Sequence, residues 1–169
     1  GEKDVGQYNR EDYVFGACAG AGIYRRDFFE QVGIFDEDFF IFAEDVDINM
    51  RGQLQGFKCI YLPEAKVYHI GTATVGLYSD RYIYLCKRND IFVLIRNYSL
   101  RMYFRHLWTI LKHQFNDIKY FTYRGQGIIL FKSKLDAFKM LLPMLFRRFR
   151  IQSSRTVPDS KIEPLIIKS

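Results

Sequence analysis

The stretch "FIFAEDVDINMRGQLQGF", residues 40–57, places carboxylates directly after an aromatic segment and admits three interpretations. Asp45, Asp47 and Asn49 stand two apart, as the first ligands of a calcium loop do. Asp45 and Asp47 alone also form a D-x-D pattern, which occurs in many divalent-metal sites. Glu44 and Asp45, finally, could serve as a catalytic carboxylate pair.

The spacing within this stretch separates the three interpretations. With Asp45 as position 1, a calcium loop needs glycine at position 6 and a bidentate glutamate at position 12, where this chain has Met50 and Gly56. The stretch is typical of a helix that begins with carboxylates and ends at Gly56. On such a helix Asp45 and Asp47 diverge by about 200° around the axis, which disfavours chelation of one ion. The pair Glu44 and Asp45 therefore remains the strongest candidate, because an Asp at a helix start can take a proton from a bound hydroxyl.

The segments around this helix, which is expected over residues 44–55, alternate in type and predict an α/β domain. Residues 13–24 are expected to form a strand with a small-residue centre, Gly20-Ala21-Gly22, where a substrate can approach the backbone closely. The other expected elements are a short helix from Asp27 to Gly33, a second short helical piece, and strands over residues 57–62 and 66–70.

After residue 71 the sequence becomes basic, and its apolar residues recur at helical spacing over long segments. Residues 1–80 hold 7 Lys or Arg against 14 Asp or Glu, whereas residues 81–150 hold 15 against 3, so the formal net charge of +6 hides an acidic half and a basic half. The apolar periodicity predicts helices over 79–98, 100–121 and 127–150, a kink at Pro143, and an extended or mobile tail after Ile151.

Length and composition indicate one domain in a reducing compartment. A chain of 169 residues with 49% hydrophobic residues can bury a core. Its three cysteines form no C-x-x-C pair, which argues against a disulfide framework or zinc ribbon and favours small buried thiols. The sequence shows neither an apolar signal segment nor a run of about 18 apolar residues, so a cytoplasmic location is expected.

Six motifs follow one another in a fixed order between Gly16 and Gly71. They are the small-residue loop before Tyr24-Arg25-Arg26, "GIFDEDFF" at 33–40, the acidic run at 44–47, Gly56, "YLPEAKVYH" at 61–69, and Gly71 itself. In this order they resemble the C-terminal half of a family 2 glycosyltransferase with the GT-A fold, of the rhamnosyltransferase-like kind. On this basis we interpret residues 1–78 as the acceptor-side half of such a catalytic domain, 79–150 as a basic helical region and 151–169 as a tail.

The resemblance implies a role for individual residues. Asp45 takes the place of the general base that activates the acceptor hydroxyl, with Glu44 beside it, and the loop Gly20-Ala21-Gly22 takes the place of a substrate-binding loop. His69 matches the histidine that completes a divalent-metal site, for Mn²⁺ or Mg²⁺. The implied chemistry is transfer of a hexose from a nucleotide-sugar to a saccharide or lipid-linked acceptor with inversion, while the metal stabilises the departing diphosphate.

The resemblance also implies a setting and a missing part. Such enzymes act in cell-surface polysaccharide biosynthesis, and their nucleotide-binding half, with its metal-binding D-x-D, precedes the matched region. We therefore expect this chain to be a fragment that binds a nucleotide-sugar poorly and transfers nothing by itself. The alternative is a non-catalytic, membrane-associated interaction module left by truncation.

The basic half has its own alternatives. Nucleic-acid binding is not expected, because no recognised motif accompanies the cations and they alternate with aliphatic and aromatic runs. Cationic amphipathic helices suit an anionic membrane surface, which would place the protein peripherally on the inner face of the cell membrane. Helices packed on the catalytic domain with solvated outer faces are the structural alternative.

Overall fold

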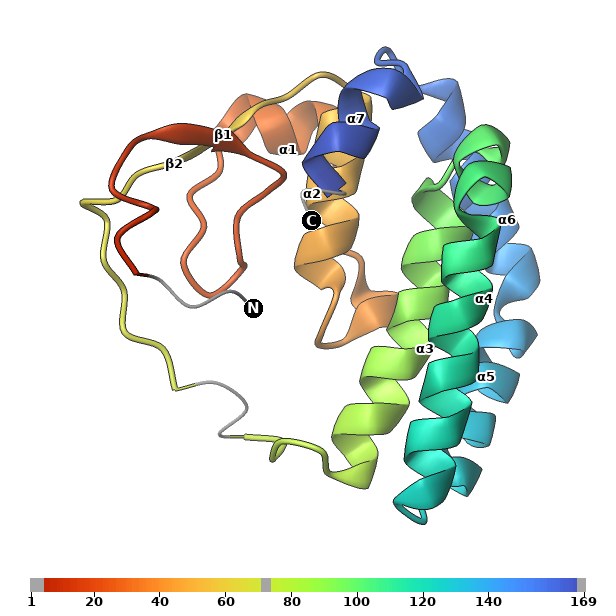
Figure 1. Cartoon of the computed structure of the whole chain (residues 1–169). Coiled ribbons are helices and arrows are strands. Elements are labelled where there is room, and N and C mark those ends of the chain that lie inside the picture. The colour runs from red at the N-terminus through yellow and green to blue at the C-terminus, as the bar shows by residue number, and fades with distance from the viewer. Residues whose placement is uncertain (1–4, 71–73, 167–169) are drawn as a thin grey trace.

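A computed structural model describes residues 5–70 and 74–166 as a body of helices that carries a small antiparallel sheet (Figure 1). The sheet and its loops lie on one side of helix α2, and the long helices lie on the other. In chain order the elements are β1 (Asp12–Val14), α1 (Arg26–Val32), the 3-10 helix η1 (Glu37–Phe39), α2 (Glu44–Leu54), β2 (Cys59–Tyr61), α3 (Asp80–Asn97), α4 (Leu100–Tyr123), α5 (Gly127–Lys139), α6 (Leu141–Ser153) and α7 (Asp159–Ile166).

The expected α/β class is confirmed only in part, because the strands are few and short. β1 and β2 pair antiparallel over three residues each, with Tyr13 opposite Ile60. The strand expected over 13–24 is wrong beyond Val14: at Gly16 the chain turns against α2 so closely that a Cβ there would lie 2.2 Å from Cγ of Asn49. The strand expected over 66–70 is also wrong, since this segment is irregular and has no neighbouring strand among the described residues.

Helix α2 begins at the predicted residue, ends one residue before the predicted end, and lies at the centre of the packing. It begins at Glu44 and ends just before Gly56, whose φ of 88° reverses the chain. Its apolar residues reach two separate clusters: Ile48 packs with Phe28 and Val32 of α1, whereas Met50 and Leu54 pack with residues of α4 and α7. The acidic motif is therefore anchored on both sides of its helix.

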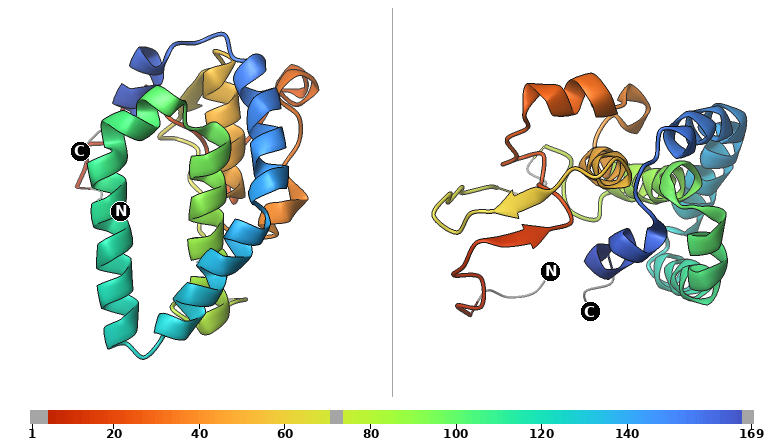
Figure 2. Two further views of the ribbon diagram at one scale, coloured as in Figure 1. Left: turned by 90° about the vertical axis from the view of Figure 1, so that its right-hand side faces the viewer. Right: turned by 90° about the horizontal axis from the view of Figure 1, so that it is seen from above.

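The long helices of the basic half are confirmed, with one difference. Helix α3 packs against α2, α5 and α6, and α4 and α5 form an antiparallel hairpin beside it (Figure 2). The helix expected over 127–150 is interrupted at Met140, which separates α5 from α6. Pro143 falls in the first turn of α6, where a proline needs no hydrogen-bond donor, so it helps to begin a helix instead of bending one.

The tail expected to be extended is folded back onto α2. The backbone amides of Thr156 and Val157 both donate to the carbonyl of Leu54, at 2.9 and 3.1 Å. Helix α7 then buries Ile162 against α2 and α4. Within the described ranges, no helix is both long and apolar enough to cross a bilayer.

Candidate active site

Asp47, the last carboxylate of the acidic run at 44–47, lies in the protein interior. It is fully buried and accepts hydrogen bonds from Nε of Arg51 and from Nδ2 of Asn97, both at 2.8 Å. Nε of Arg96 lies 3.5 Å from Oδ1 of Asp47, the oxygen that accepts from Asn97. Asp45 points elsewhere, so the expectation that the two aspartates diverge around the helix is confirmed.

The same buried network also explains the other D-x-D string, Asp36-Glu37-Asp38. Arg96 of α3 pairs with Asp36 at 2.9 Å, and Arg147 of α6 pairs with both Asp36 and Asp38. Arg51 donates to the carbonyls of Val32, the last residue of α1, and of Ile34, two residues further on. These aspartates therefore hold helices together and are not free to bind a ligand.

Asn49, the third residue of the two-apart series, fixes the small-residue loop to α2. Its Nδ2 donates to the carbonyl of Ala17 at 2.7 Å, and its Oδ1 accepts from the hydroxyl of Tyr24 at 3.3 Å. Burial raises the pKa of Tyr24, and the nearby Asp45 acts in the same direction, so the hydroxyl stays protonated as a donor. The loop between these two anchors is thereby held over the first turn of α2.

A pocket of about 330 Å³ lies between this loop and the first turn of α2. It brings together four of the residues predicted from sequence: Gly20, Glu44, Asp45 and His69. Its full lining is Cys18, Ala19, Gly20, Ile41, Phe42, Ala43, Glu44, Asp45, His69, Ile70, Thr74 and Val75. Ala21 and Gly22 belong to the same loop but do not line the pocket, and Gly71 falls outside the described residues.

Asp45 is oriented by two backbone amides. Its Oδ2 accepts from the amide of Ala19 at 3.3 Å, which joins the loop to the helix, and its Oδ1 accepts from the amide of Val46 at 2.8 Å. Asp45 is half-buried and lines the pocket. The carboxylate is therefore held in one orientation while it still borders the space where a ligand could sit.

Glu44 differs from Asp45 in having an unpaired oxygen. Its Oε2 is buried and has no hydrogen-bond partner among residues 5–70 and 74–166. Burial raises the pKa of Glu44, and the charge of Asp45 adds to the effect. Glu44 consequently holds a proton at higher pH than an ordinary glutamate does, and its buried oxygen is available to a ligand or to solvent at the pocket.

The segment that leads into Glu44 has a strained backbone. Phe40, Phe42 and Ala43 have φ values of 62°, 71° and 61°, a region that costs non-glycine residues on the order of 1–3 kcal/mol each. Nδ2 of Asn89, from the fully buried face of α3, approaches the carbonyls of Phe39, Ile41 and Phe42 at 2.8–2.9 Å. This one side chain pins the segment and so sets the position of Glu44 and Asp45.

Sequence reasoning missed Asn89 and its neighbour Arg88, which donates to the carbonyls of Asp38 and Phe39. A signal was present, because an asparagine is a poor helix former and here interrupts an apolar-periodic helix. Sequence reasoning also took the cysteines to be buried. Cys18 is exposed and lines the pocket, whereas Cys86 is half-buried and burial raises its pKa to about 11.

The described residues do not by themselves make a metal site. In residues 5–70 and 74–166, no group of three or more His, Cys, Asp or Glu side chains lies close enough to hold an ion. His69 is exposed, and its ring lies 3.8 Å from the position that a Cβ on Gly20 would occupy. His69 thus borders the pocket, but its proposed metal ligation has no complete set of partners in this part of the chain.

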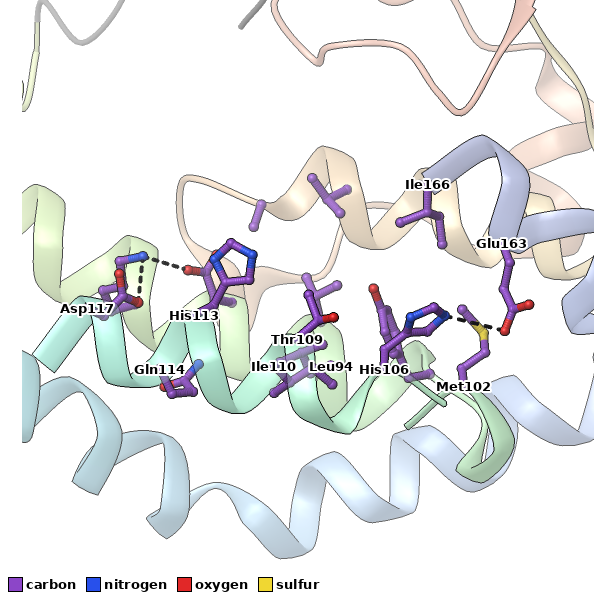
Figure 3. Close-up of a pocket in the computed structure, with 16 residues that line it drawn as sticks. Leu94, Met102, His106, Thr109, Ile110, His113, Gln114, Asp117, Glu163 and Ile166 are labelled. Carbon is purple, nitrogen blue, oxygen red and sulfur yellow. Dashed lines mark hydrogen bonds and ion pairs between the residues drawn. The ribbon is translucent and has the colours of Figure 1, made fainter. Parts of the chain in front are cut away.

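A larger cavity of about 570 Å³ lies between α3, α4 and α7 (Figure 3). Its carboxylates have cationic partners: Lys87 lies 3.0 Å from Asp117 and 3.3 Å from Asp90, and Glu163 pairs with Arg105. The two cavities share only Ala43. Because the catalytic candidates all border the smaller pocket, we assign the candidate active site there.

Comparisons with known proteins give a family and two partial relatives. The family model described as "Glycosyl transferase family group 2" matches residues 4–149. Two curated proteins, from the CDC 1551 / Oshkosh and the ATCC 25618 / H37Rv strains of Mycobacterium tuberculosis, are each 33% identical to the chain over 87 residues. Both are described as N-acetylglucosaminyl-diphospho-decaprenol L-rhamnosyltransferase, and the match covers 46% of this chain and 27% of each relative. No solved structure matches the chain significantly.

Proposed function

Because the chain belongs to glycosyl transferase family group 2 and is rhamnosyltransferase-like, we propose that it forms the acceptor side of an enzyme that transfers a hexose from a nucleotide-sugar. Membership of this family supports sugar transfer and a GT-A-related fold. The observation that carries the finer proposal is the position of Asp45, whose carboxylate joins the small-residue loop to α2 and borders a pocket together with Gly20 and His69.

Asp45 is proposed to be the general base. An acceptor hydroxyl in the pocket would give its proton to the carboxylate of Asp45 while its oxygen attacks the anomeric carbon of the donor. The bond from that carbon to the diphosphate oxygen breaks in the same displacement, so the diphosphate leaves with the bonding electrons and the configuration inverts. Since Asp45 is already held by the amides of Ala19 and Val46, it needs no rearrangement to meet the hydroxyl.

Glu44 is proposed to orient the acceptor. Its buried Oε2 has no partner in the described part of the chain, so a sugar hydroxyl that donates to it would satisfy a group left unpaired there. The small side chains at Gly20 and Ala19 leave room for the sugar ring to approach the backbone. Ala21 and Gly22 would act through the shape of the loop, since neither lines the pocket.

A divalent metal, Mn²⁺ or Mg²⁺, is proposed to assist the leaving diphosphate, with His69 as one ligand. The residues described by the structure supply no set of three ligating side chains, so the other ligands would have to come from the donor and from residues outside the described part. Within this chain, the proposal for His69 rests on its place beside the pocket and on the resemblance of "YLPEAKVYH" to the family's motif.

The acceptor class and the biosynthetic role are also proposals. The mycobacterial relatives are named for transfer to a diphospho-decaprenol-linked sugar, which supports a saccharide or lipid-linked acceptor and a role in cell-surface polysaccharide biosynthesis on the cytoplasmic side. The match covers only 27% of those relatives, so the activity proposed is that of an enzyme that includes this chain. Alone, the chain is expected to bind donors weakly and to transfer nothing. Calorimetry with UDP-, GDP- and dTDP-sugars tests this, and micromolar binding would overturn it.

The decisive experiment replaces Asp45 in the intact enzyme. Asp45→Asn keeps the size of the side chain but removes the base, so sugar transfer should fall by about 100- to 10,000-fold while donor binding is unchanged. Glu11→Gln, at an exposed carboxylate next to β1 and outside the six motifs, is the matched control and should keep full activity. Turnover of Asp45→Asn within a few fold of the unmodified enzyme would remove Asp45 from the role.

A further inference from the structure

Helix α4 exposes a stripe of large apolar side chains on the face that points away from the molecule's interior. Members of this stripe recur every three or four residues, as expected for one face of a helix. Trp108 is 80% exposed and Phe104 is 76% exposed. The whole stripe consists of Phe104, Leu107, Trp108, Leu111, Phe115 and Ile118. The other face of α4, with Met102, His106 and Ile110, lines the larger cavity (Figure 3).

The next two helices continue this feature. On α5 the exposed apolar residues are Ile128, Phe131, Leu135 and Phe138, and on α6 they are Leu142, Leu145, Phe146 and Phe149. All three helices lie on the side of the molecule away from the β1–β2 sheet and the candidate active site (Figures 1 and 2). Single exposed apolar residues are ordinary, but an apolar stripe on each of three successive helices indicates a partner.

The charges on these helices identify the chemistry of the partner. Residues 100–153 contain eleven Lys or Arg and two Asp. Both aspartates are engaged, Asp117 with Lys87 and Asp136 with Lys139. By contrast, six exposed cations make no ion pair within the described residues: Arg101, Lys112, Lys119, Arg124, Lys132 and Arg150. The partner must therefore be both apolar and anionic.

We propose that the outer faces of α4, α5 and α6 form a docking surface for a lipid bilayer that contains anionic lipids. A bilayer interface offers both required chemistries at once, since acyl chains take up the apolar stripes while anionic headgroups meet the flanking cations. A second copy of the chain would match the apolar residues but would bring like charges together. The inference concerns a surface remote from Asp45 and does not rest on the sugar-transfer chemistry.

The chain contains a built-in reporter for this docking, because Trp108 is its single tryptophan and lies within the α4 stripe. Tryptophan emission from the 169-residue chain is measured with vesicles of phosphatidylcholine alone and with vesicles that also contain phosphatidylglycerol. With the anionic vesicles, emission should shift to shorter wavelength, and bromine-labelled acyl chains should quench it. Raising the salt from about 0.1 to 1 M shortens the screening length from about 10 to 3 Å and should release the protein.

Two variants separate the apolar from the electrostatic contribution. Lys112→Gln/Lys119→Gln should bind anionic vesicles about 25-fold more weakly, at roughly fivefold for each removed cation. Phe104→Ser/Phe115→Ser should weaken binding at least about tenfold through lost apolar burial. Their controls are exposed residues outside α4, α5 and α6: Lys66→Gln for the charge, and Ile34→Ser/Val67→Ser for the apolar residues. Circular dichroism establishes that each variant is folded.

Several outcomes would overturn the proposal. These are an unchanged Trp108 emission with anionic vesicles, equal binding to vesicles of either composition, or controls that weaken binding as much as the α4 variants. A shift in emission that follows protein concentration without lipid, together with a dimer in sedimentation, would assign the surface to a second copy instead. Asp45→Asn should bind vesicles like the unmodified chain, so failure of docking and failure of the proposed transfer are distinguishable.

Discussion

The first turn of α2 and the turns that follow it satisfy their polar side chains differently. In the first turn, Glu44 has a buried oxygen that no described residue pairs with, and Asp45 borders a pocket. In the following turns, both oxygens of Asp47 have partners and each nitrogen of the Arg51 guanidinium has an acceptor. Asn49 is likewise satisfied through both its amide nitrogen and its amide oxygen.

This difference shows that neighbouring acidic residues of one helix have different roles. Buried polar groups that the protein itself satisfies serve to position helices, because any change there leaves a partner unpaired. Carboxylates with free oxygen atoms at a pocket are available to a ligand. The spacing of two between Asp45 and Asp47 therefore does not describe a chelate; it places one carboxylate at the pocket and the next in the interior.

The largest expected effect is that of Asp47→Asn on stability. The amide keeps the shape but removes the negative charge that Arg51 and Arg96 share, so the free energy of unfolding should fall by about 3–5 kcal/mol. Urea denaturation measures this, with Asp45→Asn as the matched control. Asp45→Asn should change the free energy by less than about 1 kcal/mol, because Asp45 has no ion-pair partner among the described residues. Equal losses for the two variants would break the comparison.

A smaller loss is expected for Asn89→Ala. The carbonyls of Ile41 and Phe42 would lose the donor that Asn89 supplies, whereas the carbonyl of Phe39 keeps Arg88 as a donor. The loss should destabilise the protein by about 2–3 kcal/mol. The strained segment before Glu44 would also loosen, so hydrogen exchange at residues 39–45 should accelerate more than in α5. Asn116→Ala, at an exposed asparagine of α4, is the control and should do neither. Uniform acceleration across the chain would mean that Asn89 contributes only to global stability.

The sequence was sufficient for features that depend on local pattern. The bounds of α2 follow from the carboxylates at its start and from Gly56 after its end, and the periodicity after residue 79 predicted α3 and α4 within a few residues. The motif order was also enough to select Gly20, Glu44, Asp45 and His69, which do border one pocket. These are properties that neighbouring residues determine.

The features that the sequence did not predict have a common physical cause: each depends on partners that are distant in the sequence. A strand over 66–70 needs a neighbouring strand, and none lies beside it in the described part, so its alternating apolar residues are exposed instead. A mobile tail was expected where helix α7 forms. The helix is stabilised there because Ile162 packs against Met50, Leu54 and Met102. Asn89 escaped notice because its acceptors are carbonyls that come together only after the chain turns before α2.

The smallest expected effect tests the first turn of α2 directly, through the pH dependence of Glu44→Gln. Burial raises the pKa of Glu44 in the folded protein above the ordinary value of 4.5, so ionised Glu44 disfavours folding. Its contribution to stability is therefore present below pH 4.5 and is lost as the pH rises through the folded-state pKa. Glutamine does not titrate, so Glu44→Gln should have a higher melting temperature than the unmodified protein at pH 7 and should lose this advantage below pH 4.5. Glu64→Gln, at an exposed position, should show no such trend. If Glu44→Gln is instead less stable at pH 7, then ionised Glu44 has a stabilising partner, and the first turn of α2 serves structure in the same way as the turns that follow it.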